Sequence, residues 1–226
     1  MQNARDKIGT ALVAVGLFLS VAAAGLTSYN ILDDQRADIM AQHSLEQLKE
    51  AVASVPASPL NPDEIEQTPF LDDETGLSED DGTADPIPEM PTVEVNGNLY
   101  IGTIVIPSLK LELPVMDTWD YTKMRIAPCR YVGSAYLGDL IICGHNYNSH
   151  FGRLKNLVPG DEVIFTDAVG NVFHYQVDNN EIVNGTAVQE MKSGDWDLTL
   201  FTCAKPARTT RVTVRCKLIG IEEANR

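Results

Sequence analysis

Basic residues are scarce in this sequence. It carries 17 lysines and arginines against 32 aspartates and glutamates, and no stretch of it interleaves basic and aromatic side chains. A protein that binds nucleic acid must neutralise phosphates, so this composition argues against a nucleic-acid partner. The sequence also lacks internal repeats and any Cys-x-x-Cys pair, so we expect neither a repeat architecture nor a metal site, and no cofactor.

One long run of the chain has no charge at all. Residues 8–32 are 25 uncharged, mostly apolar residues, enough to cross a hydrocarbon core of about 30 Å. Arg5 and Lys7 precede this run and Asp33 and Asp34 follow it. The positive-inside rule then predicts a cytoplasmic segment 1–7, a transmembrane signal-anchor at 8–32 and an extracellular remainder. A cleaved signal peptide is the alternative, because residues 22–24 are three alanines.

The negative charge is concentrated directly after this run. Residues 33–94 hold 17 acidic and 2 basic residues, and residues 56–97 contain seven prolines. Apolar residues at near-helical spacing (Ile39, Leu45, Leu48, Val52 and Val55) predict that a helix continues past residue 33. The proline-rich part has too little apolar surface to offset its ordering entropy. We therefore expect a stalk at 33–97 that holds the domain at 98–226 off the membrane; a lid over an active site is the alternative.

Residues 98–226 read as a series of short strands. Apolar, β-branched runs separated by turn residues occur at 100–106, 111–115, 139–143, 162–166, 172–177, 198–202 and 211–221. Short helical segments fit 117–124, 151–157 and 186–191. Many short strands at this spacing predict a mostly-β domain, a closed or nearly closed barrel with a few short helices.

Three residue types suited to acyl transfer stand at the ends of these strands. Cys203 ends an alternating strand, His145 follows a buried strand after Gly144, and Arg211 opens the last strand. A thiolate can attack a peptide carbonyl, an imidazole can protonate the departing amine, and a fixed cation can stabilise the developing oxyanion. If the last two strands pair as a hairpin, Cys203 and Arg211 face each other.

Other residues of the same types compete for these roles. His150 lies in a loop, His174 within a strand and His43 in the stalk, whereas Arg208 lies in a turn and Arg215 further along the last strand. A strand end after a glycine combines rigidity with access, which favours His145. Cys129, Cys143 and Cys216 are expected to be small buried hydrophobes, and Trp119 and Trp196 are expected to be packing residues.

Three features occur together: the sequence Thr-Leu-Phe-Thr-Cys at 199–203, the Gly-His pair at 144–145, and Arg211 at the start of a terminal strand. In combination they resemble the sortase family of Gram-positive bacteria. The resemblance spans about residues 99–221. It implies an eight-stranded β-barrel in which Cys203, His145 and Arg211 are catalytic. By analogy, residues 184–196 form a wall of the substrate pocket, and Leu200, Thr202 and Trp196 are candidate substrate contacts.

The resemblance also implies an activity. Cys203 would form a thioester with the threonine of an LPxTG-like sorting signal on a secreted protein, and an amine of a cell-wall peptide or a pilin lysine would resolve it. Asp85-Pro86-Ile87 matches the Asp-Pro-aromatic lid of pilin-polymerising sortases only in part, and no second apolar span follows Ile221. These features favour a protein-anchoring enzyme. The alternatives are a secreted cysteine hydrolase that uses water and a non-enzymatic surface β-barrel.

Overall fold

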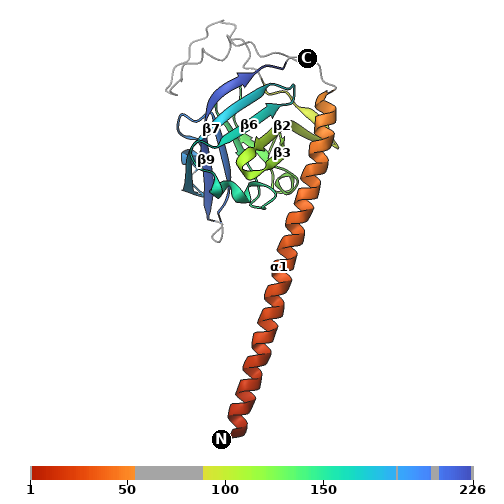
Figure 1. The fold of residues 1–226 in the computed structure, drawn as a ribbon, viewed down its shortest axis with the longest axis vertical. Coiled ribbons are helices and arrows are strands. Elements are labelled where there is room, and N and C mark those ends of the chain that lie inside the picture. The colour runs from red at the N-terminus through yellow and green to blue at the C-terminus, as the bar shows by residue number, and fades with distance from the viewer. Residues whose placement is uncertain (1, 54–88, 187, 205–208, 225–226) are drawn as a thin grey trace, which may run out of the picture.

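The protein consists of one long helix and one β-barrel (Figure 1). The computed structural model describes residues 2–53, 89–186, 188–204 and 209–224. The helices are α1 (Gln2–Ala53) and α2 (Val188–Lys192), with 3-10 turns at Pro107–Leu109, Lys123–Arg125 and Phe151–Asn156. The strands are β1 (Val93–Val95), β2 (Asn98–Ile106), β3 (Leu111–Met116), β4 (Cys129–Val132), β5 (Leu140–Cys143), β6 (Glu162–Asp167), β7 (Val172–Asn184), β8 (Leu198–Cys203) and β9 (Thr210–Glu222).

Eight of the strands form a closed ring. Their order is β2-β3-β4-β5-β8-β9-β7-β6, and β6 pairs back with β2. The pairs β3–β4 and β5–β8 are parallel and the others are antiparallel. Closure leaves no long unpaired edge in the ring. The expected mostly-β, eight-stranded barrel with short helices is therefore confirmed.

Two clusters of buried side chains hold the structure together. The larger fills the barrel with inward-facing residues of every strand in the ring except β4, among them Ile104, Phe165, Tyr175 and Val214, all fully buried. The smaller lies outside the ring, where Leu48 of α1 packs with residues of β1 to β5. The outer face of this part of the sheet is thus covered by α1, as Figure 1 shows.

The helix α1 has two different halves. The apolar side chains from Leu12 to Leu32 are exposed, and this is the one described helix long and apolar enough to span a membrane, with a mean hydropathy of 1.9. In the second half, Ala37, Ala41, Leu45 and Leu48 are buried against the barrel, a stripe at helical spacing.

The second half of α1 corrects an expectation. We expected residues 33–53 to lead the domain away from the membrane, but they lie along the barrel instead. Within the expected stripe, Leu45 and Leu48 are buried, whereas Ile39 is 68% exposed. The segment at residues 54–88, with the expected proline-rich stalk and its alternative as a lid, lies outside the described residues.

Several element boundaries also differ from expectation. The strands at 93–95 and 129–132 were missed, and the helix expected at 117–124 is only a 3-10 turn at Lys123–Arg125. Met90 is buried in the barrel core and β1 pairs with β2, so the barrel includes residues upstream of 98. Both missed strands are short and depend on pairing with a neighbour, which a local pattern does not reveal.

Candidate active site

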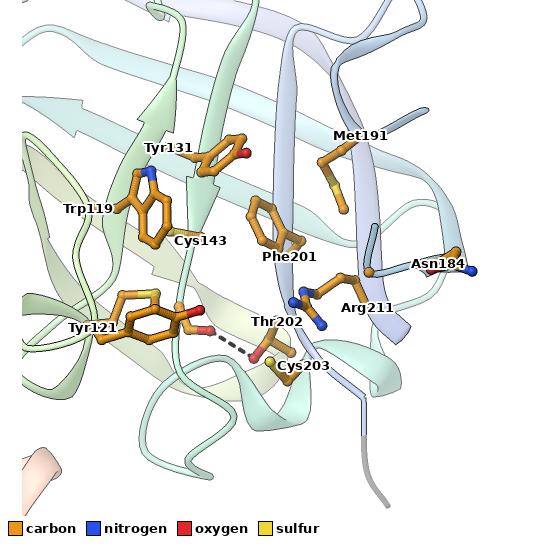
Figure 2. A pocket seen from close by; sticks show the side chains of 13 residues that line it. Trp119, Tyr121, Tyr131, Cys143, Asn184, Met191, Phe201, Thr202, Cys203 and Arg211 are labelled. Atoms are coloured by element: carbon orange, nitrogen blue, oxygen red, sulfur yellow. Dashed lines mark hydrogen bonds between the residues drawn. The ribbon is translucent and has the colours of Figure 1, made fainter. Parts of the chain in front are cut away.

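Cys203 and Arg211 lie opposite each other at one end of the barrel. Cys203 is the last residue of β8, and its register partner on the antiparallel strand β9 is Arg211. Directly opposed residues of such a pair project from the same face with Cβ atoms about 5 Å apart. The Cys203 thiol is partly exposed, and Figure 2 shows it beside the guanidinium of Arg211.

His145 follows the neighbouring strand on the other side of Cys203. β5 runs parallel to β8, with Cys143 paired to Phe201. The Gly144 amide donates to the Phe201 carbonyl at 3.1 Å, and the Thr202 hydroxyl donates to the Gly144 carbonyl at 2.8 Å. β5 ends at Cys143, and His145 follows it two residues later. His145, Cys203 and Arg211 thus lie at or just past the ends of three adjacent strands, β5, β8 and β9.

Two glycines allow the close packing around these strand ends. A Cβ atom on Gly144 would lie 2.6 Å from the ring of Phe151, and one on Gly185 would lie 2.9 Å from Nη1 of Arg211. Gly144 therefore lets β5 end against the buried Phe151, directly before His145. Gly185 lets the backbone after β7 pass close to the Arg211 guanidinium and restricts where that side chain can lie.

A cavity of about 240 Å³ opens beside Cys203 and Arg211. Its walls are mostly apolar, and Figure 2 shows the aromatic residues Trp119, Tyr121, Tyr131 and Phe201 gathered on one side of it. The ring centroids of Trp119 and Tyr131 are 5.6 Å apart, and those of Tyr131 and Phe201 are 5.3 Å apart. Such a cavity suits an extended peptide with apolar side chains.

A second cavity, of about 500 Å³, lies between α1 and the loop that follows β5. It is lined by residues of both segments, including Asp33, His145 and Tyr147, and by Arg125 of the 3-10 turn before β4. The His145 ring stacks on the Tyr147 ring with centroids 4.3 Å apart and an angle of 11° between the planes. Gly144 lines the first cavity and His145 the second, so the end of β5 contributes to both.

The candidate substrate contacts fall in different places. Thr202 lines the cavity beside Cys203, although only 3% of it is exposed. Leu200 is fully buried in the barrel core, so its expected contact with substrate is wrong: alternation along β8 turns it away from the face of Cys203. Trp196 lines another cavity, near Arg215, rather than the one beside Cys203. Of the expected pocket wall at 184–196, Asn184, Gly185 and Met191 line the cavity.

The competing histidines have other surroundings. His150 is fully buried, and burial lowers its pKa to about 4. His174 contacts Glu162 and Glu222, whose strands β6 and β9 flank β7 away from Cys203. His43 lies on α1.

The competing arginines also differ from Arg211 in their surroundings. Arg215 is 3% exposed and donates to the carbonyls of Glu190 and Met191 in α2, which gives it a structural role. Arg208 lies outside the described residues. Of the described arginines on β9, Arg211 is the one that lines the cavity.

The other three cysteines are buried, as expected of small hydrophobes. Burial raises the pKa of the Cys143 and Cys216 thiols to about 12, and it raises that of Cys129 further. These thiols stay protonated near neutral pH and are poor nucleophiles. Among the described residues, no three His, Cys, Asp or Glu side chains lie close enough together to hold a metal ion.

Comparisons with known proteins point to one family. The model of the sortase domain matches residues 104–219, just over half of the 226-residue chain. Sortase A of Listeria monocytogenes is 25% identical over 117 residues, which are 49% of this chain and 52% of that protein, so the match spans about half of the relative. The structure of Listeria monocytogenes sortase A has a TM-score of 0.51 and 22% identity and covers 56% of this chain and 92% of that one.

The family match covers all eight strands of the ring from within β2 to near the end of β9. It includes the three strand ends that carry His145, Cys203 and Arg211. The structural likeness adds the fold, a mostly-β barrel with short helices. This chain belongs to the sortase family, whose members are cysteine transpeptidases.

Proposed function

We propose that this chain is a membrane-anchored sortase that cleaves an LPxTG-like sorting signal and transfers the cleaved protein to an amine. The observation that carries the proposal is the pairing of Cys203 with Arg211 across β8 and β9 at one end of the barrel. His145 follows β5, the strand that pairs with β8 on its other side, and is the proposed third member. Family membership supports the same chemistry.

The reaction begins with the Cys203 thiolate. It attacks the carbonyl carbon of the threonine in the signal, and the carbonyl oxygen becomes an oxyanion that the Arg211 guanidinium stabilises. The bond from this carbon to the glycine nitrogen then breaks, and His145 gives its proton to the departing amine. The product is a thioester between Cys203 and the new C-terminus of the substrate.

An acceptor amine completes the cycle. It attacks the thioester carbonyl, His145 takes a proton from the attacking nitrogen, and the Cys203 thiolate leaves. A new amide bond joins substrate and acceptor, and the enzyme returns to its starting state. The acceptor is an amine of a cell-wall peptide or a pilin lysine, and the incomplete Asp-Pro-aromatic pattern at 85–87 favours the former.

The apolar half of α1 is the proposed anchor. Its exposed apolar side chains end at Leu32, and Asp33 already contacts the barrel end that carries His145. With residues 8–32 in the bilayer and residues 1–7 in the cytoplasm, this end of the barrel lies at the extracellular face of the membrane. A secreted protein still held in the membrane would present its sorting signal there.

The test is peptide cleavage with and without an acceptor. The full chain in detergent micelles is incubated with an LPxTG peptide, and the products are identified by mass spectrometry. The proposal expects an added amine to appear in the product and Cys203→Ala to abolish it. Release of free acid, unaffected by amines, would instead identify a hydrolase. Cleavage that survives Cys203→Ala would show that the chemistry lies elsewhere.

A further inference from the structure

The first turn of α1 after its apolar run lies against the loop that carries His145. The Tyr147 hydroxyl donates to Oδ2 of Asp33 at 2.7 Å, and Arg125 donates to Oδ1 of the same carboxylate at 3.0 Å. The hydrogen bond from Tyr147 is the largest influence that holds the pKa of Asp33 below its usual range. Asp33 is therefore a charged acceptor near neutral pH, and bonds to charged groups are stronger than neutral ones.

The next residue of α1 holds the same loop at a second point. Oδ1 of Asp34 accepts from the Ser149 hydroxyl at 2.7 Å and from the Ser149 amide at 3.1 Å. Beneath these bonds, Ala37 is 3% exposed and His150 is fully buried. The loop between β5 and the 3-10 turn at Phe151–Asn156 is thus clamped to α1 by two adjacent carboxylates.

Tyr147 links this clamp to the candidate catalytic histidine. Its ring is nearly parallel to that of His145, and its other neighbour is the edge of the His150 ring, at 5.5 Å between centroids. The carbonyl of His145 accepts from the Phe151 amide at 3.1 Å, which holds its backbone against the 3-10 turn that closes the same loop. The Tyr147 ring stacked on His145 contributes to the orientation of the His145 ring.

We propose that Asp33, acting through Tyr147, positions the His145 ring for proton transfer, and that Asp34 and Ser149 fix the loop that carries both. Asp33 and Asp34 are positioning residues, since neither touches the reacting atoms. The first turn beyond the proposed membrane span is then part of the catalytic unit rather than a passive tether. This inference rests on the proposed role of His145.

The clamp makes activity depend on α1. A histidine that is loosely held spends less time in reach of the leaving amine, and small misplacements of a catalytic group cost roughly 10- to 100-fold in rate. Loss of the clamp should lower kcat and leave KM unchanged, because none of the described residues that line the cavity beside Cys203 belongs to α1 or to the loop at residues 145–150.

Two variants test the link from Asp33 to His145. Asp33→Ala removes the carboxylate, and Tyr147→Phe removes the hydroxyl but keeps the ring stacked on His145. Each should lower kcat by roughly 10-fold or more with KM unchanged. The double variant should be no slower than the slower single one, because both changes break the same connection. Asp33→Glu should restore part of the rate.

The matched control breaks a different contact of the same helix. Lys49 of α1 forms an ion pair with Glu112 of β3, away from the His145 loop. Lys49→Met should leave kcat as in the wild type. The inference is overturned if Lys49→Met slows the reaction as much as Asp33→Ala, or if the effects of Asp33→Ala and Tyr147→Phe multiply.

A second measurement does not depend on activity. In the full chain with labelled histidines, the ring signals of His145, assigned with His145→Gln, should shift in Asp33→Ala and in Tyr147→Phe. The signals of His174, which contacts Glu162 and Glu222, should stay in place. Unchanged His145 signals in both variants would overturn the positioning role. An inactive wild-type chain would overturn the proposed function instead, and the histidine signals would still decide this inference.

Discussion

Replacement of Arg215 should destabilise the protein, whereas replacement of Arg211 should stop its chemistry. Both arginines lie on β9, yet their surroundings differ. The guanidinium of Arg215 donates to the carbonyls of Glu190 and Met191 at 2.7 and 2.8 Å and to a carboxylate oxygen of Glu181 at 3.0 Å. It therefore ties α2 to the barrel, next to the wall of the cavity beside Cys203.

The size of the effect follows from these contacts. A hydrogen bond to a charged group contributes about 1.5–3 kcal/mol. Arg215→Met keeps the apolar stem but removes two such bonds to buried or half-buried carbonyls and a longer one, at 3.2 Å, to the buried Thr199 hydroxyl. Glu181 is 39% exposed, so water can solvate its freed carboxylate and this pair adds little. We expect a loss of about 3 kcal/mol, which lowers the Tm of a domain of this size by about 10 °C.

The assay compares Arg215→Met with Arg211→Met in the full chain. Circular dichroism gives the Tm, and single-turnover cleavage of a sorting peptide gives the rate of acylation. Arg211 is half-buried and donates to the Thr210 carbonyl at 3.2 Å, so Arg211→Met should lower stability by about 1 kcal/mol, less than Arg215→Met, and slow acylation by about 100-fold or more. An Arg215→Met variant with the Tm of the wild type, or an Arg211→Met variant with its full acylation rate, would refute the division of roles.

Two further predictions concern the thiols and a glycine. A thiol with a pKa of about 12, as in Cys143 and Cys216, is ionised to about one part in 10⁴ at pH 8, over a thousandfold less than an ordinary thiol of pKa about 8.5. Brief alkylation of the native chain at pH 8 should therefore label Cys203 alone by mass spectrometry; labelling of Cys143 at a similar rate would contradict the structure. In Gly185→Ala the new methyl group would lie 2.7 Å from the Thr209 carbonyl oxygen and 2.9 Å from Nη1 of Arg211, so the backbone before β9 and the Arg211 guanidinium must both shift, and kcat should fall by roughly 10- to 100-fold. Gly220→Ala, whose new methyl group meets nothing within 4 Å, should keep the wild-type rate, and equal rates in the two variants would refute the steric argument.

The three candidate catalytic residues could be predicted from the sequence because each lies next to a recognisable strand end. Cys203 and Arg211 border two strands that are close in the sequence, so a hairpin register brings them together, as the structure has it. His145 required one more step, since β5 and β8 are far apart in the sequence and pair in parallel. Its catalytic role was implied by the family resemblance, and the sheet order β5-β8-β9 supports the proposal that it acts with Cys203.

The wrong expectation for Leu200 could have been avoided from the sequence alone. Residues two apart in a strand share a face, so Phe201 belongs with Cys203 and Leu200 belongs on the opposite side. The structure follows this rule: Phe201 lines the cavity and Leu200 fills the barrel. The aromatic wall of Trp119, Tyr131 and Phe201 could not be predicted, because it joins three segments that only the sheet brings together.

The contact between α1 and the barrel could not be predicted from local sequence patterns either. Ala37, Ala41 and Ser44 are small residues that carry little hydrophobic signal, yet they let the helix approach the sheet closely and are buried there. Asp33 and Asp34 resemble ordinary charges at the end of a membrane span. Their bonds to Tyr147 and Ser149 span more than a hundred residues of sequence, and only the folded structure reveals them.

The most direct test of the account is the mass of the acyl-enzyme. The full chain is mixed with an LPxTG peptide without an acceptor amine, quenched in acid and digested, and the modified residue is identified by mass spectrometry. The account predicts that the part of the peptide ending in threonine is attached to Cys203, that the adduct disappears when an amine is added, and that His145→Ala strongly reduces it. Peptide cleavage with no adduct on Cys203, or with the adduct on another residue, would contradict it.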